Sequence, residues 1–294
     1  MSIQDAVKKM RGPENTRVTL TILRKDMKEP KDFEITRAVI KIKSVKHNVY
    51  EDSIGYIRIS AFQESTVDEL RKALQQINGK SKDLKGIVVD VRNNPGGLLD
   101  QAVKASDAFL KSGTIVSTRG RAKAIESKFV ARDDGSEPMC PIVVLVNEGT
   151  ASASEILSGA LQDNGRAIVL GMPTFGKGSV QTVIPLEDGS ALKLTTAKYY
   201  TPKGRSIQAE GIKPDIVVEP IRQAEGPETA EAQMLREKDL KGHIRGDREA
   251  EQKPAEGKGK EQGKDKTDLQ RDNQLKSAVD ILKSWEVFKR IGKN

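Results

Sequence analysis

The sequence predicts an α/β domain with a largely parallel sheet at its centre. Short apolar runs, typical of buried strands, alternate with segments whose apolar residues recur at helical spacing. This alternation of strand and helix is typical of a layered α/β protein. Hydrophobic residues make up only 36% and charged residues 31% of the 294-residue chain. We therefore expect part of the chain to lie outside any packed core.

Short elements precede this domain. Ser2 is a suitable N-cap for a helix over residues 3–10. Alternating side chains predict a strand over 17–24, and a second strand is expected over 33–36. These elements are too short to form a core alone.

The alternating part follows, and Gly113 marks the end of its second helix. The expected order is strand 54–59, a helix after Ser65, strand 86–90, a helix from about 98, strand 142–146, helix 150–161, strand 167–170, and strand 180–186 paired with strand 191–199. Glu187–Ser190 forms the turn of this last pair.

The composition changes after about residue 224. The segment Arg236–Thr267 contains almost no large apolar residue, so it is predicted to be disordered. From Asp272 onward, apolar residues at helical spacing predict a terminal amphipathic helix; they are Leu275, Val279, Leu282 and Trp285. We expect this helix to pack on its own domain; the alternative is a docking helix for a partner subunit.

Composition argues against several classes of protein. The single cysteine, Cys140, excludes an intramolecular disulfide and a zinc site of the CxxC type, and two histidines make a His-rich metal centre improbable. No apolar run approaches the roughly 20 residues of a membrane span, and residues 1–12 lack the apolar region of a signal peptide. The net charge is +8, but basic and acidic residues are interleaved and only 4% are aromatic, which argues against nucleic-acid binding.

A run of small residues, Asn147–Glu155, lies between a predicted buried strand and a helix. The free N–H groups at a helix start favour developing negative charge, so Ser152 is well placed to attack a carbonyl. Serine and threonine are also common helix caps, and this run alone favours that simpler interpretation.

A lysine between two glycines lies in Pro173–Gln181, directly before a predicted strand. The Walker pattern does not fit, because Gly178 separates Lys177 from Ser179 and no helix follows. A free lysine has a pKa of roughly 10.4, but burial lowers such a value, and a neutral amine can take a proton from serine. The histidines, His47 and His243, are predicted to be solvated.

The third loop, Asp90–Leu99, contains a proline and two glycines after a buried strand. Glycines expose backbone N–H groups, which makes this loop a candidate oxyanion hole. An ordinary strand-to-helix turn is the alternative, since asparagine, proline and glycine all favour turns.

Together these stretches resemble carboxyl-terminal processing proteases, the tail-specific serine proteases of the S41 type. The resemblance covers about residues 1–220, with motifs in the expected order. The matching motifs are Arg92–Leu99, Val146–Ile156, Gly171–Gln181, and Thr201–Gln208 with Gly211–Asp215.

The resemblance implies roles for individual residues. Ser152 matches the nucleophile, with Ser154 as its nearest rival, and Lys177, 25 residues after Ser152, matches the general base. Gln181 matches a third member that orients the lysine amine, and four strand positions would place it on the same side as Lys177. The implied oxyanion donors are the backbone N–H groups of Ala153 and Gly96, with Gly97 as the alternative.

The resemblance also implies a crotonase-like or ClpP-like layered core that follows a PDZ domain. Only the back half of a PDZ domain is matched, by a helix at residues 2–11 and strands at 17–36. We therefore expect a partial PDZ domain over 1–37, the peptidase core over 38–224, a charged linker over 225–267 and a terminal helix over 268–294. The chain looks like an N-terminally truncated gene product or one whose start codon was misplaced, and both interpretations stay open. We expect the chain to lack gating and tail selection.

The function implied is a serine endopeptidase that cleaves near the C-termini of unfolded or loosely folded proteins, without metal or cofactor. For the complete protein the resemblance implies the periplasm or cell envelope. The expected partners are the C-terminal tails of polypeptide substrates; a homo-oligomer and an adaptor protein are further candidates, which the resemblance does not supply. Two alternatives stay open: a non-catalytic scaffold subunit, and a crotonase-type acyl-CoA enzyme, which would tolerate alanine at Lys177 and Gln181.

Overall fold

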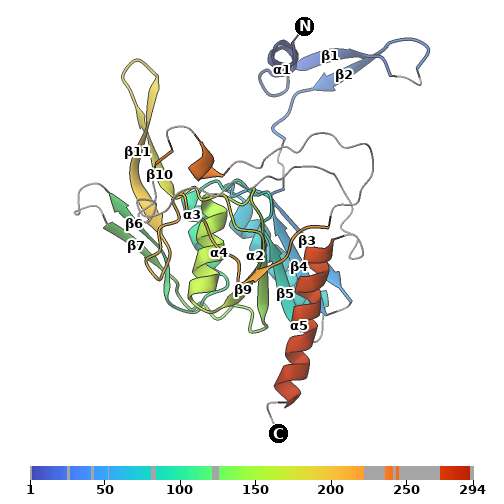
Figure 1. Cartoon of the computed structure of the whole chain (residues 1–294). Coiled ribbons are helices and arrows are strands. Elements are labelled where there is room, and N and C mark those ends of the chain that lie inside the picture. Colours follow the sequence, from blue (N-terminus) through green and yellow to red (C-terminus); the bar gives the residue numbers. More distant parts are fainter. Residues whose placement is uncertain are drawn as a thin grey trace. The chain divides into compact units, whose positions relative to one another are not determined.

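The computed structural model describes residues 2–24, 27–40, 43–51, 53–80, 84–120, 126–221, 236–240, 243–244 and 272–291. The chain divides into two compact units, one up to Ile42 and one from Lys43 (Figure 1). None of the described helices is long and apolar enough to cross a membrane.

The N-terminal unit consists of α1 (Ile3–Met10) and an antiparallel hairpin of β1 (Arg17–Ile22) and β2 (Lys31–Thr36). The predicted cap is confirmed, because Ser2 Oγ accepts from the Asp5 N–H at 3.1 Å. The Arg37 guanidinium joins helix to hairpin by donating to the carbonyl of Met10 and the hydroxyl of Thr16, both at 2.8 Å. No described residue of this unit is buried, as expected for elements too short to form a core.

The second unit is built on a six-stranded sheet in the order β12-β9-β8-β5-β4-β3. All neighbouring strands are parallel except β3, which pairs antiparallel with β4 at one edge. The strands are β3 (Val45–Tyr50), β4 (Ile54–Ile59), β5 (Gly86–Asp90), β8 (Ile142–Val146), β9 (Ala167–Gly171) and β12 (Ile216–Val217). The predicted parallel sheet is therefore confirmed, with the edge strands β3 and β12 added.

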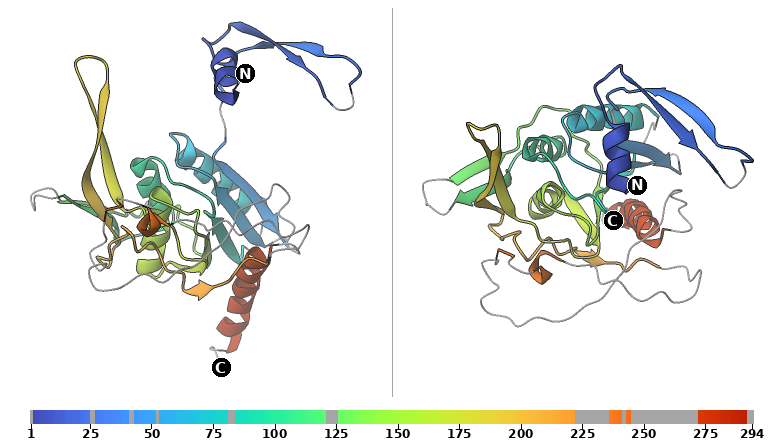
Figure 2. Two further views of the ribbon diagram at one scale, coloured as in Figure 1. Left: turned by 45° about the horizontal axis from the view of Figure 1, so that its top comes forward. Right: turned by 90° about the horizontal axis from the view of Figure 1, so that it is seen from above.

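Helices cover both faces of this sheet (Figure 2). One face packs against α2 (Thr66–Lys80), α3 (Leu99–Asp107) and α4 (Ala153–Asp163), and the other packs against α5 (Asn273–Ile291). Neighbouring strand residues therefore enter different cores: Val89 joins the first cluster and Val88 the second. Burial on both faces explains why these strands are continuous apolar runs.

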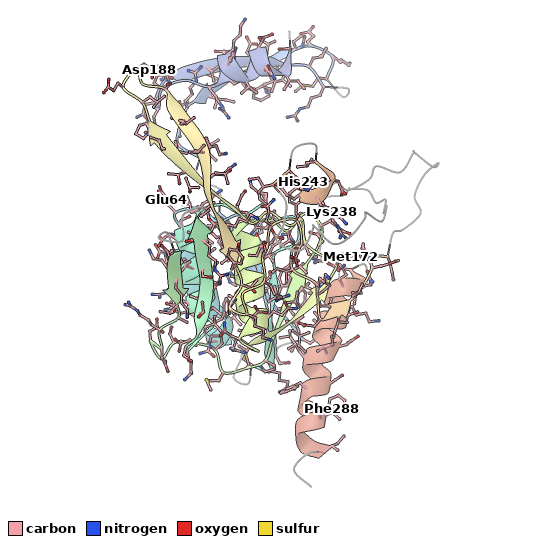
Figure 3. The ribbon with its side chains drawn as sticks, turned by 60° about the vertical axis from the view of Figure 1, so that its left-hand side comes forward. Glu64, Met172, Asp188, Lys238, His243 and Phe288 are labelled. Atoms are coloured by element: carbon pink, nitrogen blue, oxygen red, sulfur yellow. The ribbon has the colours of Figure 1, made fainter. Side chains whose placement is uncertain are left out.

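The terminal helix packs on its own domain, as expected, but only along its first half. Leu275, Ala278, Val279 and Leu282 are buried against the sheet. Beyond them Trp285 and Phe288 are 46% and 68% exposed, and Phe288 lies near the far end of α5 (Figure 3). The helical periodicity is thus correct to Leu282, whereas Trp285 lies past the edge of the core.

A second, antiparallel sheet has the order β10-β11-β6-β7. Its strands are β6 (Thr114–Gly120), β7 (Glu126–Val130), β10 (Ser179–Pro185) and β11 (Ala191–Tyr200). The predicted pairing of β10 with β11 is confirmed. Only residues 197–200 of β11 also pair with β6, so the outer part is a two-stranded ribbon with Asp188 in its turn (Figure 3).

Part of the segment predicted to be disordered is ordered. Glu237–Asp239 forms a 3₁₀ turn in which the Glu237 N–H donates to the Phe175 carbonyl at 3.2 Å and its carboxylate accepts from Gln208 at 3.1 Å. The expectation of disorder is therefore wrong for residues 236–240. Apart from these and residues 243–244, the linker 225–267 lies outside the described residues.

Candidate active site

Three loops meet at the carboxyl edge of the parallel sheet. They follow the neighbouring strands β5, β8 and β9, which lie side by side in register. Ligand sites of open α/β sheets lie in this position, because the strand ends present loops from several elements to one place. The three loops are those that the sequence singles out for chemistry.

The loop after β8 turns sharply at Ser152, which is half-buried and has a φ of 55°. A residue other than glycine adopts a backbone conformation with positive φ only where contacts with neighbouring residues hold it there. Here Thr150 Oγ1 accepts from the Asn147 N–H at 3.0 Å and donates to the Val91 carbonyl at 2.9 Å. The Ala151 N–H donates to a neighbouring loop, at the Asn94 carbonyl, at 2.9 Å.

The helix after this turn begins at Ala153, not at Thr150 as the sequence predicts. The difference arises because Thr150 and Ala151 bond to the β5 loop instead of joining a helical turn. Ser152 therefore stands at the N-cap of α4, where the helix dipole favours negative charge.

The glycine loop after β5 lies directly against this turn. Gly96 has a φ of 101°, and a Cβ there would lie 2.8 Å from the Ala151 carbonyl oxygen and 2.9 Å from the Ala153 nitrogen. The Gly96 N–H donates to Asn94 Oδ1 at 2.9 Å, whereas no described acceptor bonds the Gly97 N–H. Of the two candidate oxyanion glycines, Gly97 thus has the N–H that no described residue already accepts from.

A buried carboxylate, Glu155, joins the turn after β8 to the loop after β9. Its Oε2 accepts from the main-chain N–H groups of Ser152 at 2.8 Å and Lys177 at 2.9 Å. Its Oε1 accepts from Thr174 Oγ1 at 2.5 Å and the Gly176 N–H at 2.7 Å. One side chain therefore holds the main chain of both predicted catalytic residues.

Burial raises the pKa of Glu155 to about 7, and its four hydrogen bonds partly oppose this effect. All four partners are donors, so the ionised carboxylate satisfies every one of them. Sequence reasoning assigns Glu155 no role. The available signal is its spacing, because a Glu three residues after a Ser at a helix start matches the capping-box pattern.

Lys177 lies on a turn that packs against the segment after β11. Gly176 and Gly178 flank it; the Gly176 carbonyl accepts from the Ala209 N–H at 2.8 Å and the Gly178 N–H donates to Gln208 Oε1 at 3.0 Å. Backbone atoms of residues 207–211 lie where a Cβ on either glycine would be, which explains why both positions are glycine. The Lys177 side chain is half-buried.

Gln181 is exposed and lies in β10, where the register with β11 shifts between Val180 and Gln181. A β-bulge breaks the strict alternation of side chains. The expectation that Gln181 faces the same side as Lys177, which assumes a regular strand, therefore loses its basis. Among these described residues, no hydrogen bond joins the Lys177 side chain to Ser152 or Gln181.

Comparison with known proteins identifies the family of this chain. The model of peptidase family S41 matches residues 53–218, more than half of the chain. The chain belongs to this family. All three loops of the site fall within the matched S41 residues.

Individual S41 relatives are similar over most of this chain. It is 50% identical over 255 residues to a carboxy-terminal-processing protease of Bartonella bacilliformis, covering 85% of this chain and 57% of that protein. It is 44% identical to a carboxyl-terminal-processing protease of Synechocystis, covering 74% of this chain and 51% of the relative. The chain thus spans about half the length of these relatives.

A solved structure titled photosystem II D1 C-terminal processing protease has a similar fold. The TM-score is 0.56 at 30% sequence identity, and the match covers 74% of this chain and 60% of that one. The layered core expected from the resemblance is thereby confirmed.

Proposed function

We propose that this chain is a serine endopeptidase that cleaves polypeptides near their C-termini, with Ser152 as nucleophile and Lys177 as general base. The observation that carries the proposal is the shared hydrogen-bond acceptor: the N–H groups of both residues bond to Glu155 Oε2. A carboxylate buried between two loops fixes their separation, and fixed separation is what a nucleophile and its base require.

The reaction would proceed by acyl transfer. Ser152 Oγ attacks the scissile carbonyl while the Lys177 amine takes its proton, and the same proton then passes to the leaving amine. The developing oxyanion accepts from the N–H groups of Ala153 and a glycine of the Gly96–Gly97 turn. Among the described residues the Gly96 N–H is already bonded to Asn94 whereas no acceptor bonds the Gly97 N–H, which supports Gly97 over Gly96 for that role. Water then hydrolyses the ester on Ser152.

The proposed role of Gln181, orienting the Lys177 amine, rests on the family pattern alone. Its exposed position and the bulge beside it give it no support in this structure. The envelope location implied by the resemblance likewise stays a prediction, as do the adaptor, the oligomer and a partial PDZ domain in the N-terminal unit.

Covalent labelling tests the nucleophile directly. A fluorophosphonate probe should add to Ser152 of the full chain, and peptide mass spectrometry should locate it there. Ser154→Ala should keep the label, because Ser154 is fully buried and its hydroxyl donates to the Asn94 carbonyl. A label on another residue, or labelling that persists in Ser152→Ala, would refute the assignment.

Cleavage position tests the substrate class. Unstructured peptides of one sequence, with a free or an amidated C-terminus, should both be cut near that end. The expected lack of tail selection adds that the two peptides should be cut at similar rates, and product masses give the bond. Cuts spread evenly along the peptide would contradict cleavage near C-termini while leaving the serine mechanism intact.

A further inference from the structure

Arg92 uses all five of its guanidinium N–H donors on three side chains. Nε and Nη2 donate to Asp90 at 3.0 and 2.6 Å, and Nη1 and Nη2 donate to Asp272 at 2.9 and 2.7 Å. The remaining Nη1 donor bonds to Gln274 Oε1 at 3.0 Å. Two bidentate carboxylate pairs and no spare donor fix the guanidinium in one orientation.

The two carboxylates come from distant parts of the chain. Asp90 ends β5 and its side chain is fully buried, whereas Asp272 lies 180 residues after Arg92 and directly precedes α5. Asp272 Oδ1 also accepts from the Leu275 N–H at 3.0 Å, so the carboxylate that binds Arg92 also caps α5. The terminal helix is therefore joined by its first turn to the end of β5.

The charges of this cluster balance. Arg58 Nη1 also lies 3.1 Å from Asp90 Oδ2, so two arginines face two aspartates. The Arg92 side chain is only 12% exposed. Removing the charge of Asp272 would leave a mostly buried guanidinium with one partner too few, which favours movement of the arginine.

Arg92 lies only a few residues before the glycines of the proposed oxyanion loop, so its movement would shift that loop. Asn93 follows with a φ of 55° and exchanges two hydrogen bonds of 2.8 Å with Asn147. Asn94 then holds the Gly96 N–H through Oδ1 and the Ala151 N–H through its carbonyl. The main chain thus runs in four steps from Arg92 to Gly96.

We propose that Asp272 is a positioning residue for the active site. Through its hydrogen bonds to Arg92, it connects the docked terminal helix to the proposed oxyanion loop and helps to hold that loop in place. The proposal rests on the proposed function, and it assigns α5 a role in the rate of the reaction as well as in the core. Loss of the link should lower kcat and leave KM nearly unchanged, because an oxyanion forms only after substrate has bound.

Asp272→Asn isolates the link. Asparagine is as good an N-cap as aspartate, so α5 keeps its cap, but one carboxylate oxygen becomes an NH₂ group that faces an Arg92 donor. Two variants serve as controls. Asp280→Asn makes the same charge change at an exposed position of α5, and Val279→Ala weakens the packing of α5 without touching Arg92.

Peptide cleavage and amide hydrogen exchange of residues 93–97 are measured on the full chain and its variants. In Asp272→Asn we expect kcat to fall at least tenfold, KM to stay within twofold, and exchange at 93–97 to accelerate. Asp280→Asn should match the parent. Val279→Ala should lose stability but keep kcat within twofold.

Two results overturn the proposal. The first is a kcat of Asp272→Asn within twofold of that of the parent. The second is a Val279→Ala variant that has the same melting temperature as Asp272→Asn and loses as much kcat. Cleavage that survives Ser152→Ala refutes the proposed function instead. In that case the link between Asp272 and the loop at residues 93–97 is judged by hydrogen exchange alone. Unchanged exchange at residues 93–97 in Asp272→Asn overturns the link.

Discussion

Ser152 and Lys177 lie 25 residues apart in the sequence, yet their main-chain N–H groups bond to one oxygen atom, Oε2 of Glu155, at 2.8 and 2.9 Å. A helix cap and a glycine turn are thereby fixed to each other through a buried side chain. This relationship makes the geometry of the site sensitive to a residue that takes no part in the proposed chemistry.

Glu155→Gln should disrupt that relationship. The amide group would direct N–H donors at main-chain donors, so we expect kcat to fall by about 100-fold, the scale of an approximately 1 Å misplacement. The free energy of unfolding should drop by about 2–3 kcal/mol for the unsatisfied buried groups. Steady-state kinetics and urea unfolding measure the two effects; a folded variant with parental kcat would contradict the positioning role.

Stability should depend on pH through the same residue. The pKa of Glu155 is raised to about 7 from 4.5, so the native state binds this proton more tightly than the unfolded chain. The resulting stabilisation is complete below about pH 4.5 and is lost as pH rises through 7. Relative to Glu155→Gln, the parent's free energy of unfolding should fall by about 3 kcal/mol between pH 4.5 and 8. Parallel pH profiles for the two proteins would argue against the raised pKa.

Gly96→Ala should remove activity by crowding. Its φ of 101° disfavours alanine, and the new Cβ would lie 2.8 Å from the Ala151 carbonyl oxygen. We expect at least a 100-fold loss of kcat and a cost of about 1–3 kcal/mol. Gly204→Ala is the matched control, because its φ is 76° but no atom lies within 4 Å. If both variants lost activity equally, strain rather than crowding at the site would be the cause.

The packing of α5 predicts that substitutions in its two halves differ in their effect on stability. Leu282 is 1% exposed and its side chain contacts the position that a Cβ on Gly86 would occupy, so Leu282→Ala should cost about 2–5 kcal/mol. Phe288→Ala, at a side chain 68% exposed, should change stability by less than about 0.5 kcal/mol. Urea unfolding of both variants gives the comparison, and equal effects would mean that the far half of α5 is also packed.

The elements with strong local signals could be predicted from the sequence. Continuous apolar runs at 86–90 and 142–146 are buried strands, and the loops that follow them hold the site. The strand β3 was missed because it lies at an edge, where polar side chains face solvent and the apolar pattern is weak. The strands β6 and β7 were missed for a related reason, because both belong to the smaller sheet and carry several polar residues.

The site itself depends on contacts that no local pattern contains. The turn at Ser152 is set by bonds to the β5 loop, so the start of α4 shifted from Thr150 to Ala153. The bulge at Gln181 follows from pairing with β11, which strand periodicity does not reveal. The pairing of Arg92 with Asp272 joins residues 180 positions apart.

The central claim is that Ser152 and Lys177 carry the reaction, and cleavage kinetics test it most directly. The rate on an unstructured reporter peptide is measured for the full chain, Ser152→Ala and Lys177→Ala, with circular dichroism to show that all three are folded. The account predicts a loss of at least about 1,000-fold in kcat for each substitution, because a nucleophile and its base fail as a unit. A folded Ser152→Ala or Lys177→Ala variant that cleaves at the parental rate would contradict it.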